Sequence, residues 1–370
     1  MNLNRRSFVL GSALVPIASS AQTAERVHTG VIGVGNRGSY LLQAILEQPD
    51  ARVVALCDVK PDRLDKAASS AARDNPQTYA DWRRILDRKD VQAVFIATPP
   101  YLHSEMAIAA LEAGKHVYCE KPIGITVDQV RRLLAAAKRS DRIFVPGQQL
   151  RSLKSLQTAV AQIHEGLIGD VLMIKAQRHA PADLPHDGSS ADWYFDVSKS
   201  GGYLIEQSVH NLDLCNWVMR AHPVRAAGFG ATLRYKNDPP GRTIFDCGVL
   251  SFDYPNELKL SFTQNVFHPR GMPNGGQYLY VYGTKGAVDL MAPQATAYPL
   301  TASGQPSIVS TKADDQQSAH IAAFYASVTR GAAPPADITI GATAALTSIL
   351  GNEAMVKGRV VQWSELGVEL

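Results

Sequence analysis

The chain has 370 residues, of which 45% are hydrophobic and 19% charged, and its formal net charge is +3 at pH 7. This length and apolar content allow a large buried core and predict two domains. The small, dispersed charge, without a long basic run, argues against a nucleic-acid partner.

The first 26 residues have the pattern of an export signal. Arg5 and Arg6 precede the apolar stretch Gly11 to Ala18 and a run of small residues that ends at Ala21. This pattern resembles a twin-arginine signal, and the apolar stretch is too short for a stable membrane span. We therefore expect residues 1–26 to direct the folded protein to the periplasm; a disordered basic leader is the alternative.

A predicted strand from Val27 to Val34 opens a glycine-rich turn, Gly33-Val34-Gly35-Asn36-Arg37-Gly38. Gly33 permits the tight turn, Gly35 lets backbone amides approach a pyrophosphate, and Gly38 lets the next helix pack closely on the sheet. The start of that helix, with Asn36 and Arg37, attracts phosphates. The turn therefore predicts a dinucleotide site.

An acidic residue follows the second predicted strand, Arg52 to Leu56. Asp58 stands where a ribose diol would arrive, and its carboxylate would repel a 2′-phosphate, which favours NAD over NADP. Lys60 and Arg63 follow at the start of a helix and could reach such a phosphate, so NADP stays possible.

Helices and strands then alternate, which indicates a parallel sheet covered on both faces. The predicted elements are a helix from Asp81 to Leu86, a strand from Val91 to Ala97, a helix from His103 to Ala113, a strand from His116 to Cys119, a helix from Val127 to Arg139 and a strand from Ile143 to Val145. Residues 27–147 are therefore predicted to form a doubly wound α/β Rossmann domain. Ligands bind beyond the carboxyl ends of such strands, where Thr98, Pro99 and Glu120-Lys121-Pro122 fall.

Residues 148–370 are predicted to form an α+β substrate and oligomerisation domain. Helices are expected at Ser152 to Glu165, His320 to Arg330 and Ala342 to Val356, and the last two could pack against either domain. Strand-like composition recurs at Val171 to Arg178, Ala226 to Leu233, Cys247 to Tyr254, Glu257 to Asn265 and Gln277 to Gly283.

A single helix is predicted from Gly202 to about Arg220. Tyr203, Glu206, His210, Asp213 and Trp217 recur along it at three- and four-residue spacing and would share one face. Burying such a face costs several kcal/mol unless each group is paired, so it is either solvated or lines a site. Glu206 and His210 supply two metal ligands with no evident third, and the four cysteines lack ligand spacing, so no metal is expected.

Several ordered motifs resemble the glucose-fructose oxidoreductase and inositol dehydrogenase family, called Gfo/Idh/MocA, from about Val27 to the C-terminus. They are Gly33 to Gly38, Ala97 to His103, Gly114 to Pro122, Gly201-Gly202 followed by Glu206, His210 and Asp213, and Tyr282 to Gly286. The resemblance implies a Rossmann domain followed by a domain with a mostly antiparallel, open-faced sheet. That sheet often serves as an oligomer interface, so a homodimer or homotetramer is expected.

The resemblance also assigns catalytic roles to Lys121, Glu206 and His210. His210 would accept the proton of a sugar hydroxyl while hydride leaves its carbon for the nicotinamide, and Lys121 would stabilise the same oxygen. Glu206 replaces the usual aspartate and is one methylene longer, so its role as orienter or proton relay stays open.

Further residues are expected around the cofactor and the substrate. Besides the glycine turn and Asp58, the cofactor site is expected to include Thr98, Pro99, His103, Glu120 and Lys121. Aromatic faces stack on sugar C–H surfaces, and polar groups bind hydroxyls. The residues expected to contact the substrate in these ways are Tyr101, Gln148, Arg151, His179, Trp193, Tyr194 and Asp213. Packing or surface roles are the alternative for each of these.

These predictions favour an oxidoreductase that moves hydride between a carbohydrate or related alcohol and a tightly bound NAD. A redox-neutral, NAD-dependent glycosidase of the same fold is an alternative, because an exported enzyme cannot draw on the cytoplasmic nicotinamide pool. A non-catalytic dinucleotide sensor is a third interpretation, but it would leave Lys121 and the face with Glu206 and His210 unexplained.

Overall fold

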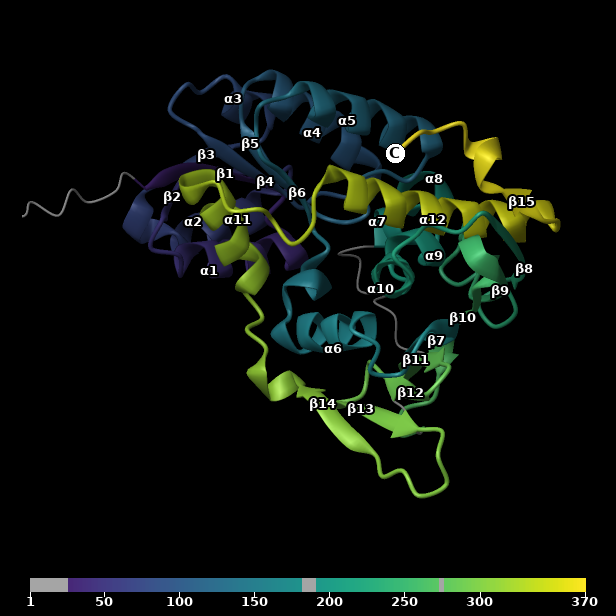
Figure 1. Ribbon diagram of the computed structural model, residues 1–370. Helices are drawn as coiled ribbons and strands as arrows, with labels where there is room; N and C mark the ends of the chain where they lie inside the picture. The colour runs from purple at the N-terminus through teal and green to yellow at the C-terminus, as the bar shows by residue number, and fades with distance from the viewer. Residues whose placement is uncertain (1–25, 182–190, 273–275) are drawn as a thin grey trace, which may run out of the picture.

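The computed structural model describes residues 26–181, 191–272 and 276–370, which form two sheets with associated helices (Figure 1). The predicted export signal lies outside the described residues, apart from Arg26. Within the described ranges, no helix has both the length and the apolar character needed to cross a membrane.

The first sheet has six parallel strands in the order β3-β2-β1-β4-β5-β6. These are β1 (Val27–Ile32), β2 (Ala51–Cys57), β3 (Gln77–Tyr79), β4 (Ala93–Ile96), β5 (His116–Cys119) and β6 (Phe144–Pro146). The accompanying helices are α1 (Asn36–Leu46), α2 (Pro61–Ser70), α3 (Arg83–Leu86), α4 (His103–Glu112) and α5 (Val127–Arg139). The predicted Rossmann fold is confirmed. The strand order reverses between β1 and β4, which places a ligand crevice at their carboxyl ends.

The second sheet has nine strands in the order β14-β13-β12-β11-β7-β10-β9-β8-β15. β7 and β10 pair in parallel and the other described neighbours are antiparallel, as the family resemblance implied. The strands are β7 (Val171–Pro181), β8 (Arg225–Ala231), β9 (Cys247–Asp253), β10 (Lys259–His268), β11 (Gln277–Gly283), β12 (Gly286–Asp289), β13 (Gln294–Pro299), β14 (Ser307–Thr311) and β15 (Val361–Gln362).

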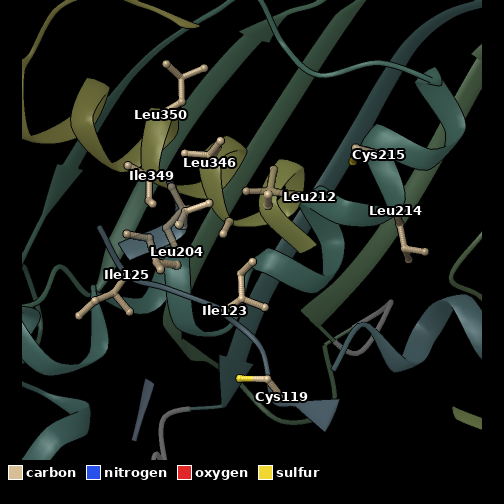
Figure 2. Packing of buried hydrophobic residues seen from close by; sticks show 14 of the residues in the cluster. Cys119, Ile123, Ile125, Leu204, Leu212, Leu214, Cys215, Leu346, Ile349 and Leu350 are labelled. Carbon is tan, nitrogen blue, oxygen red and sulfur yellow. The ribbon is translucent and has the colours of Figure 1, made fainter. Parts of the chain in front are cut away.

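Helices of the second half connect the two sheets. They are α6 (Lys154–His164), α7 (Ala191–Tyr194), α8 (Val197–Ser200), α9 (Tyr203–Glu206), α10 (Val209–Met219), α11 (Ala319–Arg330) and α12 (Ile338–Lys357). α12 packs on α5 on one side and on β8 and α10 on the other. Figure 2 shows Leu346 and Ile349 of α12 in one cluster with Ile123 and Leu204, so this apolar cluster includes residues from both halves of the chain.

The predicted continuous helix from Gly202 to Arg220 is wrong, because the chain breaks it into α9 and α10 at Gln207 and Ser208. At this break the Ser208 hydroxyl donates to Gln264 Oε1 on β10 (3.1 Å). A helix end leaves carbonyl oxygens without intrahelical partners. The break therefore makes the Glu206 carbonyl available to another donor.

α11 covers the first sheet although it lies late in the sequence. Phe324 packs edge-on against Phe95 of β4, with ring centroids 4.8 Å apart, and against Tyr118 of β5. The hydroxyl groups of Tyr325 and Thr29 are hydrogen-bonded at 2.8 Å. The Rossmann core thus includes residues from the last quarter of the chain.

We predict that Phe324→Ala lowers the free energy of unfolding by about 3–5 kcal/mol, because it opens a cavity between α11 and the first sheet. Denaturant titration of the purified protein measures this change. Phe229→Ala is the matched control, since that ring is 76% exposed and leaves no cavity. Equal effects of the two substitutions would show that α11 contributes little to the core.

Candidate functional site

The glycine turn after β1 has the close contacts that a dinucleotide motif requires. Gly33 has a φ of +84°, and a Cβ there would lie 2.7 Å from the Ala97 carbonyl oxygen. A Cβ on Gly38 would lie 1.8 Å from the Gly33 carbonyl oxygen, so only glycine fits. Gly35 precedes α1 and faces a cavity of about 320 Å³, which Asn36 and Arg37 also line. The turn therefore fits a bound pyrophosphate at the α1 N-terminus.

Asp58 closes the far side of the same cavity. One carboxylate oxygen accepts from the Val34 amide and the other from the Lys60 amide, each at 2.9 Å. A carboxylate has about four acceptor positions, so capacity remains for ribose hydroxyls. The side chain thus holds the glycine turn and the β2 loop in place around the expected ribose.

A second cavity, of about 440 Å³, adjoins the first and contains the predicted catalytic residues. Arg37, Thr98 and Trp193 line both cavities. Lys121, Glu206 and His210 all line the second, together with Pro100, His103, Glu120, Gln149, Leu150, Arg178, Gln207, Gln277 and Met291. Two cavities joined at the carboxyl ends of β1 and β4 are the arrangement expected for a cofactor beside its substrate.

Lys121 connects the two domains at the centre of this second cavity. It follows β5, and its Nζ donates to Glu206 Oε1 at 2.9 Å and to the Glu206 carbonyl oxygen at 2.6 Å. The carbonyl is the one that the break between α9 and α10 makes available. Both side chains are about nine-tenths buried, so the ammonium group is held rigidly with its remaining N–H free for a ligand.

His210 lies in the first turn of α10 and is 9% exposed. Its Nδ1 is buried without a hydrogen-bond partner among the described residues. Burial lowers the pKa of His210 well below 6.5, and the positive charges of Lys121, Arg178 and Arg37 lower it further. The imidazole is therefore neutral at neutral pH and able to accept a proton.

Glu120 organises the loop that carries Lys121. Its Oε1 accepts from Arg37 Nε at 2.6 Å, and its Oε2 accepts from the Lys121 amide at 3.2 Å. The Glu120 side chain is 5% exposed and that of Arg37 is 35% exposed, so water reaches this ion pair mainly from the arginine side. Glu120 therefore connects α1, which follows the glycine turn, to the loop that carries Lys121.

His103, which we expected at the cofactor, has both ring nitrogens on backbone carbonyl oxygens. Nδ1 lies 2.7 Å from Pro122 O, and Nε2 lies 2.8 Å from Thr98 O. A neutral imidazole has one N–H, so the ring donates to one of these carbonyl oxygens and lies in contact with the other. The ring therefore packs between the loop after β4 and the loop after β5. Burial lowers its pKa below 6.5.

Arg151 and Asp213, expected at the substrate, lie outside both described cavities and bind each other. Arg151 Nη2 contacts Asp213 Oδ1 at 2.8 Å and Nε contacts Oδ2 at 2.9 Å, while the guanidinium stacks over Trp217. Both side chains are at least 90% buried. Of the predicted common face, Glu206 and His210 line the cavity, whereas Asp213 pairs with Arg151 in the segment after β6.

The other predicted substrate contacts divide in the same way. Trp193 lines both cavities and Tyr101 lines the cofactor cavity, as Pro99 does. Gln148 and Tyr194 are buried beside the site without lining either cavity, and His179 bonds Thr263 on β10. Sequence reasoning missed Arg178 and its glutamine neighbours. Arg178 is the last residue of a predicted strand, and this position could have indicated a role in the site. The glutamines have no comparable sequence signal.

The four cysteines are free thiols, and three of them are buried. No group of three potential metal ligands occurs in the described ranges.

Comparison with known proteins identifies the family. Residues 27–148 match the family model described as oxidoreductase family, NAD-binding Rossmann fold, and residues 156–289 match the GFO/IDH/MocA C-terminal domain. The chain belongs to the Gfo/Idh/MocA family. Residues 27–148 form an NAD-binding Rossmann domain, which agrees with the glycine turn and with Asp58.

Relatives in this family have more than one recorded activity. A glycosyl hydrolase family 109 protein of Saccharopolyspora erythraea is 33% identical over 169 residues, 44% of this chain and 36% of that protein. Myo-inositol 2-dehydrogenase of Thermotoga maritima is 28% identical over 190 residues, 51% of this chain and 54% of that protein. The chain thus spans about a third to a half of these relatives.

Solved structures confirm the fold over nearly the whole chain. Levoglucosan dehydrogenase in complex with NADH and levoglucosan superimposes with a TM-score of 0.79 at 20% identity, covering 91% of this chain and 99% of the other. Myo-inositol 2-dehydrogenase from Lactobacillus plantarum gives 0.76 at 21% identity, with the same coverage.

We predict that Asp213→Asn lowers the free energy of unfolding by about 3–5 kcal/mol, because Arg151 would lose its countercharge while staying buried. Chemical denaturation at pH 7 provides the measurement. Asp141→Asn is the control, since Asp141 pairs with Arg142 at the surface and such pairs contribute about 1 kcal/mol or less. An unchanged stability with a raised KM would instead return Asp213 to the substrate site.

Proposed function

We propose that the protein oxidises a CH–OH group of a sugar, polyol or related alcohol and passes the hydride to tightly bound NAD. The observation that carries this proposal is the convergence of Lys121 and His210, from two different domains, on one cavity beside the dinucleotide cavity. The inositol and levoglucosan dehydrogenases among its relatives support the same class of substrate.

The residues of this chain would handle the hydroxyl proton. NAD, when bound, supplies the hydride acceptor. Neutral His210 accepts the proton from the reacting hydroxyl, and the remaining N–H of Lys121 stabilises the oxygen as its negative charge develops. Glu206 has one oxygen on Lys121 and the other on the Gln207 amide. Its role is therefore to position Lys121 and not to relay a proton from His210.

We predict that Lys121→Ala and His210→Ala each lower kcat by about 10²- to 10⁴-fold, because each removes a positioned acid-base or electrostatic group. Glu206→Gln should be milder, since the glutamine carbonyl still accepts from Lys121. Steady-state kinetics with the best substrate of a sugar and polyol panel gives kcat, and NADH fluorescence titration should show unchanged cofactor affinity. Lys138→Ala, an exposed position on α5, is the control. Normal turnover in His210→Ala would overturn the mechanism.

A redox-neutral glycosidase is a second candidate, favoured by the similarity to glycosyl hydrolase family 109 proteins. Such a cycle would oxidise C3, remove the C2 proton with loss of the glycosidic substituent from C1, add water at C1 and return the hydride to C3. Its redox steps would need the same Lys121 and His210. Such a closed cycle also suits the predicted export from the cytoplasm.

One experiment separates the two candidates. Purified protein is incubated with a panel of chromogenic glycosides and free sugars, while released aglycone and reduced-nicotinamide absorbance are followed together. We predict a lasting rise in absorbance with at least one free sugar or polyol, and no aglycone release. Aglycone release in excess of cofactor, without a lasting rise, would establish the glycosidase instead.

A further inference from the structure

The substrate cavity contains more positive than negative side chains. Arg37 pairs with Glu120 at 2.6 Å, and Lys121 pairs with Glu206 at 2.9 Å. Arg178, near the end of β7, also lines the cavity but forms no ion pair with any carboxylate in the described ranges. With His210 neutral, the described wall of the cavity therefore has a surplus of one positive charge.

Neutral carboxamides hold the Arg178 guanidinium in place. Its Nη1 donates to Gln277 Oε1 at 2.6 Å, and its Nη2 donates to Gln207 Oε1 at 2.9 Å. Each terminal nitrogen carries two N–H groups, so one remains on each. The guanidinium is thus fixed in orientation while its charge is left uncompensated, which is the state of a binding group and not of a structural ion pair.

We propose that Arg178 is a carboxylate-binding residue and that the substrate is an acidic sugar, a carbohydrate carrying a carboxylate group. A carboxylate would accept from both terminal nitrogens in the bidentate geometry that a guanidinium favours. It would also cancel the surplus charge, whereas a neutral hydroxyl would leave a partly desolvated cation unpaired. This inference rests on the proposed function, because it assigns the substrate class of the same cavity.

The placement of Arg178 suits a substrate of monosaccharide size. Gln207, which accepts from Arg178, donates through its amide to Glu206, and Glu206 binds Lys121. This chain of contacts puts the carboxylate subsite and the reacting hydroxyl at two places along one wall. The cavity volume of about 440 Å³ lies within the usual range for small-molecule sites, roughly 300–1,000 Å³.

A bound carboxylate would also raise the pKa of His210, the proposed base. The positive charges of Lys121, Arg178 and Arg37 all lower the pKa of His210. A negative charge at Arg178 offsets part of that effect and makes His210 a stronger proton acceptor when an acidic sugar is present. Discrimination between acidic and neutral sugars would then appear in kcat as well as in binding.

Isothermal titration of the NADH-loaded protein tests this inference without requiring turnover. The ligands are hexoses of gluco, galacto and manno configuration, their uronates and their 6-phosphates, each as the methyl glycoside. We expect at least one uronate to bind about 10- to 100-fold more tightly than its matched hexose, the range for hydrogen bonds to charged groups. Binding of every uronate no tighter than its hexose, or weaker than its 6-phosphate, would overturn the inference.

Substitution assigns the preference to the residue. Arg178→Gln should abolish the difference between uronate and hexose, and Arg178→Lys should retain part of it, with unchanged NADH affinity as the check on folding. Lys175→Gln is the matched control, because it removes one positive charge from an exposed position on the same strand. A preference that survives Arg178→Gln would overturn the inference. Selective uronate binding without hydride transfer would retain the subsite while overturning the proposed function.

Discussion

The ion pair between Lys121 and Glu206 is the contact on which the site depends. Each partner comes from a different domain, and neither is positioned by its own domain alone. Lys121 is delivered by the loop after β5, which Glu120 and His103 fasten to neighbouring loops. Glu206 is presented by a helix that ends at that residue. The Lys121–Glu206 pair therefore forms only when the two domains are docked.

The apolar core explains why this docking is stable. α12 packs between α5 of the first domain and β8 of the second, so its leucines and isoleucines contribute to both at once (Figure 2). Separating the domains would expose that surface, at a cost of roughly 25 cal/mol per Å² of apolar area. The polar groups of the cavity can then remain incompletely paired, because the surrounding core fixes their positions.

The sequence was sufficient for features set by local pattern. The Rossmann alternation, the glycine turn and the position of Lys121 follow from strand periodicity and from the rule that ligands bind at strand ends. The sequence was insufficient where contacts between residues distant in the chain determine the local structure. The helix break at Ser208 is accompanied by a hydrogen bond to Gln264, and Asp213 pairs with Arg151; both are contacts between residues far apart in the sequence. Strands β3, β12, β13, β14 and β15 were also not predicted from the sequence. They are short or polar, and pairing with neighbouring strands stabilises them more than their own composition does.

The return of α11 to the first sheet has a consequence for biosynthesis. Phe95 and Tyr118 are buried against a helix that the ribosome makes some two hundred residues after them. One apolar face of the nascent Rossmann sheet therefore has no covering helix until α11 has been synthesised. Domains that are continuous in sequence can mature one after the other during translation. In this protein both domains depend on segments from the last quarter of the chain, α11 for the first and α12 with β15 for the second, so neither is complete until translation is nearly over.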